Sequence, residues 1–309
     1  MNPHPPSGQQ YELVHGDQRA IVVEVGAGLR LYEAGGRPLI DPYAESEMCK
    51  SGRGQVLIPW PNRIADGTYE FDGRAYHLPL TEPEAGNAIH GLVRWRQWSP
   101  REKQANRVVM EHVLNPQPGF PFTLELTIEY ALSDGGLSVH TLARNVGDRP
   151  CPFGAGAHPY LTLQTDPVDS LVLRVPAATM LESDDRGIPT GSRPVAGTDY
   201  DFRESREIGT TVLDHAFTDL ERDADGIARA TLDDRSQGRG IELWVDRNHS
   251  HLMVFSGDPL PDVNRRALAI EPMTCPPNAF RTGDGVIRLE PGESVSLRWG
   301  LGQRIPASP

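Results

Sequence analysis

The stretch TLELTIEYAL at residues 123–132 alternates apolar and polar side chains. Its apolar residues occupy every second position: Leu124, Leu126, Ile128, Tyr130 and Leu132. A period of two is typical of a β-strand that has one face buried and the other in water. The next residues, Ser133-Asp134-Gly135-Gly136, form a turn signal, and LSVHTLARN at 137–145 reads as a second strand. This part of the sequence therefore predicts an antiparallel hairpin.

Similar short apolar runs, bounded by glycine and proline, recur along the rest of the chain. They lie at 20–25, 28–33, 170–175, 228–232, 241–245, 251–256, 267–271 and 295–299. Amphipathic helices longer than about ten residues are not evident, and 214–222 is expected to form one short turn of helix at most. We therefore predict an all-β fold, a large antiparallel β-sandwich, rather than alternating strands and helices. The 31 glycines and 28 prolines suit the many turns of such a fold.

Composition bounds the domain organisation and the partners. Neither a shift in composition nor a repeat marks a boundary, so we expect a single domain over residues 1–309, with 1–15 flexible. A net charge of −12 argues against nucleic acid as a partner. With no secretory signal and no apolar run approaching about 18 residues, we expect a cytoplasmic protein without membrane contact, as a monomer or homodimer.

Metal and disulfide sites find little support in the sequence. The 3 cysteines lack CxxC spacing, which argues against a disulfide framework and a thiolate zinc site. His249 and His251 form an HxH pair that one face of a strand would present to a metal, but no third ligand follows at a suitable spacing. We therefore expect neither a metal nor a cofactor.

Two residues stand out as a candidate acid and base. His158 lies between the small residues Gly154-Ala155-Gly156-Ala157 and Pro159, a stiff frame that leaves space around the imidazole. Glu271 ends an apolar strand just before Pro272, where burial would raise its pKa. The plainer alternatives are a histidine that caps a turn and a strand-end salt bridge to an arginine.

Three further polar residues lie among apolar neighbours and are candidates for binding. They are Arg63, which follows the turn Pro59-Trp60-Pro61; His90, which is flanked by Gly91; and Asp214, which precedes His215.

Taken together, these segments resemble blocks of the aldose 1-epimerase (galactose mutarotase-like) family. The blocks are PNRIADGTYEFDG at 61–73, Ile89-His90-Gly91-Leu92, Trp98, Asn145 with Pro152-Phe153 and GAHPY at 156–160, Asp201-Phe202-Arg203, Asp214-His215 and Glu271. They occur in the family's order across about residues 55–280. The residues after Glu271 depart from the continuation in the best-known galactose mutarotases and look more like a divergent bacterial branch.

The resemblance implies a sugar site in an open cleft on a concave sheet, with neither metal nor cofactor. His158 would act as general acid on the ring oxygen and Glu271 as general base on the C1 hydroxyl, so that the ring opens and closes with inversion at C1. Arg63, His90 and Asp214 would bind the sugar. We expect a protonated imidazole beside an ionised carboxylate, each stabilising the other's charge. Aromatic platforms are available in Trp60, Tyr69, Trp95 and Trp98.

Three alternatives stay open on the sequence alone. A phosphorylated or sulfonated hexose would need an arginine cluster, which Arg53, Arg94 and Arg96 could supply. A glycoside hydrolase would use Glu271 with Asp214. A non-catalytic carbohydrate-binding protein would keep the aromatic and polar groups without needing an acid–base pair.

Overall fold

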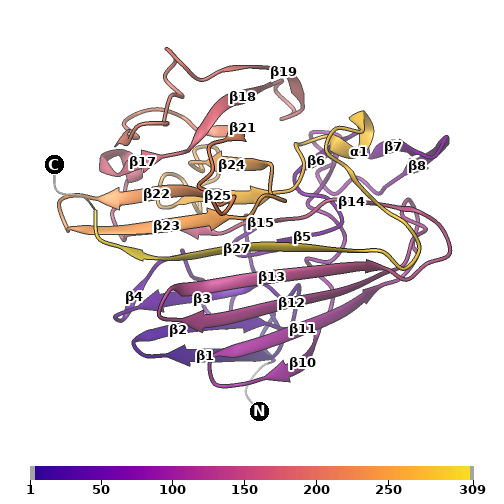
Figure 1. Ribbon diagram of the computed structural model, residues 1–309, viewed down its shortest axis with the longest axis horizontal. Coiled ribbons are helices and arrows are strands. Elements are labelled where there is room, and N and C mark those ends of the chain that lie inside the picture. The colour runs from indigo at the N-terminus through magenta and orange to yellow at the C-terminus, as the bar shows by residue number, and fades with distance from the viewer. Residues whose placement is uncertain (1–3, 307–309) are drawn as a thin grey trace.

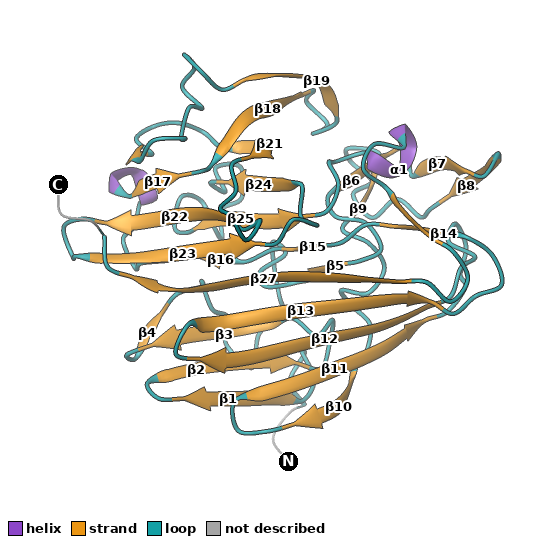
Figure 2. Cartoon of the chain, in the orientation of Figure 1, coloured by secondary structure: helices purple, strands orange, loops and turns teal. Residues whose placement is uncertain are grey.

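Antiparallel strands make up nearly all of the regular structure (Figure 2). The computed structural model describes residues 4–306. Within that range the strands form large antiparallel sheets, as the alternation in 123–132 predicts. The predicted all-β architecture is confirmed.

The sheet with the most strands has nine of them and runs across the middle of the molecule in Figure 1. In spatial order they are β10 (Ser99–Lys103), β11 (Arg107–Leu114), β12 (Leu124–Ser133), β13 (Gly136–Asn145), β27 (Ser294–Arg304), β23 (Arg239–Val245), β22 (Ala228–Asp234), β17 (Val172–Arg174) and β20 (Arg206–Glu207). Strand β12 buries every second side chain, from Leu124 to Leu132, as predicted. The side chains between them are exposed or half-buried, so one face of this strand packs inward.

A second sheet of eight strands carries most of the candidate site. In spatial order its strands are β19 (Pro189–Pro194), β18 (Ala177–Ser183), β21 (Asp214–Leu220), β24 (His251–Phe255), β25 (Leu268–Met273), β15 (Gly156–Ala157) and β5 (Val56–Leu57), and β16 (Tyr160–Leu161) also pairs with β25. Residues 158 and 159 therefore lie between two short strands that both pair with β25. This arrangement brings the GAHPY segment beside Glu271.

The remaining elements are smaller. They are the four-stranded sheet β1 (Gln10–His15), β2 (Gln18–Val23), β3 (Leu29–Ala34) and β4 (Arg37–Pro38); the pairs β6 (Arg63–Ala65) with β9 (Asn87–Ile89), β7 (Thr68–Phe71) with β8 (Arg74–His77), and β14 (Cys151–Phe153) with β26 (Ile287–Leu289); the 3-10 helix η1 (Val168–Ser170); and the helix α1 (Ala279–Thr282). Strands β1 and β2 contact β12. Among residues 4–306, none of the helices has the length and apolarity needed to cross a bilayer.

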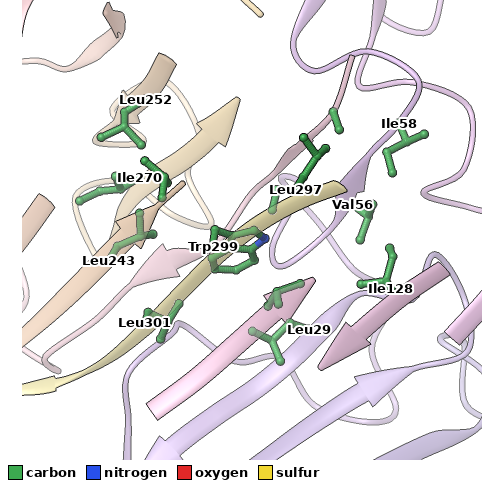
Figure 3. Close-up of a cluster of buried hydrophobic side chains, with 14 of the residues drawn as sticks. Leu29, Val56, Ile58, Ile128, Leu243, Leu252, Ile270, Leu297, Trp299 and Leu301 are labelled. Carbon is green, nitrogen blue, oxygen red and sulfur yellow. The ribbon is translucent and has the colours of Figure 1, made fainter. Parts of the chain in front are cut away.

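The hydrophobic core lies between the large sheets (Figure 3). Leu243 of β23 and Trp299 of β27 belong to the same buried cluster as Leu252 of β24 and Ile270 of β25. All four are at most 5% exposed. Burial of side chains this large is the main force that holds the sheets together, and it fixes the position of β25 and hence of Glu271.

Two expectations about local structure differ from what is observed. Residues 214–222 do not form a helical turn: Asp214–Leu220 is strand β21, because its backbone pairs with β18 on one side and β24 on the other. Within 1–15, the segment expected to be flexible, Gln10–His15 forms β1 and pairs along its whole length with β2. Residues 1–3 of that segment lie outside the described part.

Candidate active site

One cleft of about 320 Å³ brings together all of the polar residues that the sequence singles out as catalytic or binding candidates. They are Arg63, His90, His158, Asp214 and Glu271. A larger hollow of about 780 Å³ lies elsewhere and is lined by none of these five residues. Chemistry based on the candidate residues therefore belongs to the smaller cleft.

His158 and Glu271 are in direct contact at the bottom of this cleft. His158 Nε2 lies 3.3 Å from Glu271 Oε1, and the two residues are 5% and 2% exposed. The other polar atoms of the pair, His158 Nδ1 and Glu271 Oε2, are buried without a hydrogen-bond partner among the described residues. Buried polar atoms are nearly always paired, so these unpaired atoms are available to a ligand.

Neighbouring backbone and one tyrosine hold the imidazole in place. The His158 amide donates to Gln55 O (3.0 Å), and the Gly54 amide donates to His158 O (2.9 Å). The ring stacks on Tyr160, with centroids 4.9 Å apart and planes inclined by 20°. Tyr160 in turn donates its hydroxyl to Ser51 O at 3.0 Å. The loop before β5 and strand β16 therefore fix the ring from two sides.

Burial decides the protonation of the pair, and the result differs from the expected ion pair. Removal from water lowers the pKa of His158 to about 3, with smaller contributions from the charges of Arg94 and Arg63. Burial, and then the charge of Asp214, raise the pKa of Glu271 well above its ordinary value. Both shifts favour a neutral imidazole beside a protonated carboxyl. The pair holds one proton between two adjacent atoms, as coupled groups do.

Arg63, at the start of β6, is fixed by an acidic partner. Its Nε and Nη2 donate to the two carboxylate oxygens of Glu82 at 2.9 and 3.0 Å. Asn87 Nδ2 also donates to Glu82, at 2.9 Å. Such a bidentate pair is strong and fixes the plane of the guanidinium. No sequence pattern singles out Glu82, which lies in the polar loop between β8 and β9.

His90 and Asp214 complete the polar lining. His90 adopts a left-handed backbone (φ 62°), and its ring lies edge-on to that of His158 at 5.4 Å. Burial, helped by the charges of Arg94 and Arg63, lowers its pKa well below the ordinary value, which favours the neutral ring. Asp214 is exposed to the cleft, yet the surrounding protein raises its pKa while the charge of Arg63 opposes that shift.

Of the four aromatic residues expected as platforms, one lines the cleft. Trp60, Tyr69 and Trp98 are between 1% and 3% exposed and pack in the core. Trp95 is 45% exposed and lies at the cleft. The three arginines that could have supplied a cluster for an anionic hexose do not come together either. Arg53 pairs with Asp41 and Asp262, and Arg96 donates to Leu92 O and Gln117 away from the cleft, which leaves Arg94 as the one of the three that lines it.

The HxH pair is occupied by protein contacts. His249 Nδ1 lies 2.8 Å from Asp246 Oδ1, and His251 Nδ1 lies 2.8 Å from Ser250 Oγ. Strand β24 begins at His251, so the two histidines do not share a strand face. In the described part of the chain, no group of three or more His, Cys, Asp or Glu side chains is arranged to hold a metal ion.

Known proteins resemble this chain over nearly its full length. The family model for aldose 1-epimerase matches residues 9–301. An uncharacterised Escherichia coli protein, YihR, is 38% identical over 300 residues, covering 96% of this chain and 94% of its own. Aldose 1-epimerase of E. coli is 28% identical over 274 residues, covering 79% and 77%. A solved structure of a GalM/aldose epimerase homologue from C. elegans superposes with a TM-score of 0.85 at 19% identity, covering 96% and 99%.

Proposed function

Because the chain belongs to the aldose 1-epimerase family, a family of sugar isomerases, we propose that it interconverts the α and β anomers of a hexose or a related sugar. The observation that carries the proposal is the contact between His158 and Glu271, 3.3 Å apart and buried at the bottom of a cleft. Anomer exchange needs one proton removed and one delivered within a single small site. A buried pair that shares one proton is suited to that task.

The proton balance follows from the reaction. A base takes the proton of the C1 hydroxyl, the bond between C1 and the ring oxygen O5 breaks, and an acid delivers a proton to O5. The C1–C2 bond of the open aldehyde rotates, and the reverse steps close the ring on the other face of C1. We assign the base to Glu271 and the acid to His158. Each cycle restores the proton to the pair, so no cofactor enters the balance.

These roles require the proton to lie on His158 when the sugar is bound. Burial by itself favours a neutral imidazole and a protonated carboxyl. Sugar hydroxyls that donate to the unpartnered Glu271 Oε2 would favour the carboxylate, because hydrogen bonds to a charged form stabilise that form. The proton then moves across the contact to the imidazole. Substrate binding thus prepares the acid and the base in one step.

The remaining lining residues suit sugar recognition. Arg63, fixed by Glu82, presents a guanidinium, while His90 and Asp214 offer a neutral imidazole and a carboxylate. Polar groups held in place on strands and stiff turns lose little entropy when they bind hydroxyls. Trp95 is placed to pack on an apolar face of the sugar ring.

Anomer exchange of pure sugars tests the proposal. Wild type, His158→Ala and Glu271→Gln are each added to freshly dissolved α anomers, and equilibration is followed by polarimetry or NMR exchange. We expect wild type to exceed the buffer rate and each variant to lose at least about a hundredfold in kcat/KM. Equilibration at the buffer rate with every neutral and charged aldose tried would refute the proposal. Release of an aglycone would instead indicate glycoside hydrolysis, and binding without turnover a carbohydrate-binding protein.

A further inference from the structure

Arg94 is a half-buried cation that has no partner. It lines the cleft, and it makes no hydrogen bond or ion pair with any residue between 4 and 306. Every other buried or half-buried arginine in that range donates to a carboxylate or carbonyl oxygen. Arg63, in the same cleft, is paired with Glu82. Arg94 is therefore the cation of this cleft that stays free for a ligand.

An unpaired cation in such a position destabilises the folded protein. A guanidinium stays charged at all accessible pH values, so it cannot escape the loss of water by releasing its proton. Moving a charge out of water without a counter-charge or hydrogen-bond acceptor is unfavourable. A ligand that brings the missing anion would relieve this unfavourable term.

The surroundings of Arg94 favour an anion over any other ligand group. Cys49, Gln55, Arg94 and Trp95 line both the cleft and a small hollow at its end, and no carboxylate lines that hollow. The Cys49 thiol is neutral, because burial raises its pKa to about 12. Glu82, a carboxylate of the same cleft whose charge acts on Arg94, already accepts from Arg63 and Asn87 and makes no hydrogen bond with Arg94 among the described residues.

A second polar group, the side-chain amide of Gln55, also favours an anionic ligand. Gln55 is 4% exposed, and its Oε1 has no hydrogen-bond partner among the described residues. The two ends of a side-chain amide are interchangeable by rotation, so this buried amide can present an N–H donor to an anionic oxygen. The Arg94 guanidinium lies 5.7 Å from the centre of the Trp95 ring, which limits its positions at the cleft entrance.

We propose that Arg94, assisted by Gln55, binds an anionic substituent of the sugar, a phosphate, sulfonate or carboxylate carried away from C1. This inference rests on the proposed function, because the position of C1 is taken from the His158–Glu271 pair. The charge of Arg94 acts on the His158 imidazole, and the His158 amide donates to Gln55 O at 3.0 Å, so both residues lie on the side of the cleft where His158 would meet the ring oxygen. The anionic group would therefore be carried on C6, which is joined to that oxygen through C5. The substrate class is then an anionic hexose rather than a neutral one.

Binding of sugars that cannot open their ring tests the subsite without relying on catalysis. The probes are the methyl glycosides of glucose and galactose and their 6-phosphate, 6-sulfonate and 6-carboxylate forms, titrated into wild type by calorimetry. At least one charged probe should bind about 10- to 100-fold more tightly than its neutral parent. The charged probe with the largest ratio identifies the anion.

Two matched variants assign the effect to one side chain. Arg94→Gln should reduce the ratio of charged to neutral affinity towards one, whereas Arg96→Gln, which removes a guanidinium outside the cleft, should leave that ratio at the wild-type value. The turn that carries both residues is held by backbone hydrogen bonds, from Arg96 N to Val93 O (3.0 Å) and from Gly26 N to Arg96 O (2.7 Å), and neither substitution removes these bonds.

The outcomes separate the two proposals. Wild type that binds neutral probes as tightly as charged ones, or equal losses in Arg94→Gln and Arg96→Gln, would overturn the anion subsite. Charged preference in binding without acceleration of any free sugar's anomer exchange would support the subsite and reject the isomerase. Fast anomer exchange of neutral sugars, without tighter binding of charged probes, would support the isomerase and reject the anion subsite.

Discussion

A Cβ atom on Gly52 would lie 2.7 Å from Cδ2 of the His158 imidazole, so the loop before β5 leaves room for this ring only because residue 52 has no side chain. The loop also has a positive φ at Gly52 (75°). The position of the candidate acid therefore depends on a glycine that lies 106 residues before it in the sequence.

Gly52→Ala should displace the His158 ring from Glu271. We expect a fall of at least about tenfold in kcat/KM for anomer exchange, because a displacement of about 1 Å in a catalytic contact is enough for such a loss. Gly36→Ala is the matched control, since Gly36 has a similar φ (69°) and nothing within 4 Å of an added Cβ. Both variants carry the same backbone strain of about 1 kcal/mol, measured by urea unfolding. Equal loss of activity in the two would contradict the steric link.

The pH dependence follows from the directions of the two pKa shifts. The pair keeps one proton from the lowered pKa of His158, about 3, up to the raised pKa of Glu271. We expect kcat/KM to be flat through neutral pH. It should fall in acid as a second proton binds, and in alkali as the last proton leaves. A profile measured between about pH 3 and about pH 10 that declines from neutral pH towards pH 5 would argue against a buried neutral imidazole.

Asp214→Asn should move the alkaline limb of that profile. The charge of Asp214 raises the pKa of Glu271, so its removal lets Glu271 lose its proton at a lower pH. The limb should shift towards neutrality whatever happens to the height of the profile. Asp219→Asn, on the same strand but outside the lining of the cleft, is the control that should leave the limb in place. An unmoved limb in Asp214→Asn would show that the two carboxyl groups are not coupled.

Glu82→Gln tests whether Arg63 must be held to bind the sugar. The amide offers one acceptor oxygen in place of two and turns an NH₂ group towards the guanidinium, so the bidentate pair is lost. We expect KM to rise about tenfold, the equivalent of one charge-assisted hydrogen bond, with a smaller change in kcat. Glu102→Gln breaks an exposed pair with Arg107 and should change neither constant. A fall in kcat at constant KM would place Arg63 in the chemical step instead.

Strands could be predicted from the sequence where the alternation of apolar and polar residues within one segment was enough to identify them. Strand β12 shows its period of two in the burial of Leu124 to Leu132, because a sheet with one buried face imposes that alternation directly. Strand β21 was not predicted, because Asp214–Leu220 pairs with β18 and β24, whose positions depend on the whole fold. Pairing partners of this kind override weak local preference.

The candidate site likewise contains residues that the sequence predicts and residues that only the structure identifies. The five polar residues expected to line it do lie in one cleft. They could be singled out because four of them lie close to a glycine or proline in the chain and Asp214 lies among apolar neighbours. Glu82 and Gln55 could not be found, because a glutamate and a glutamine in unremarkable contexts gain meaning only from the atoms opposite them. The expected contact between His158 and Glu271 is present, but burial shifts both pKa values against the ion pair, and the sequence does not show how deeply the two residues are buried. The cytoplasmic location and the oligomeric state stay predictions.

Two tryptophans three positions apart should respond in opposite ways to removal. Trp95 is 45% exposed at the cleft, whereas Trp98 is 1% exposed in the core. We expect Trp95→Ala to raise KM about three- to tenfold through loss of ring stacking, and to change the free energy of unfolding by less than about 0.5 kcal/mol.

Trp98→Ala should instead lower the free energy of unfolding by about 3–5 kcal/mol, because it leaves a cavity in a packed core, while the folded fraction keeps a KM near that of wild type. Urea unfolding and anomer-exchange kinetics on both variants give the comparison. If Trp95→Ala destabilises the protein without changing KM, its ring packs against the protein and not against the sugar. The aromatic contact would then be expected from Phe255, a half-buried residue that lines the same cleft.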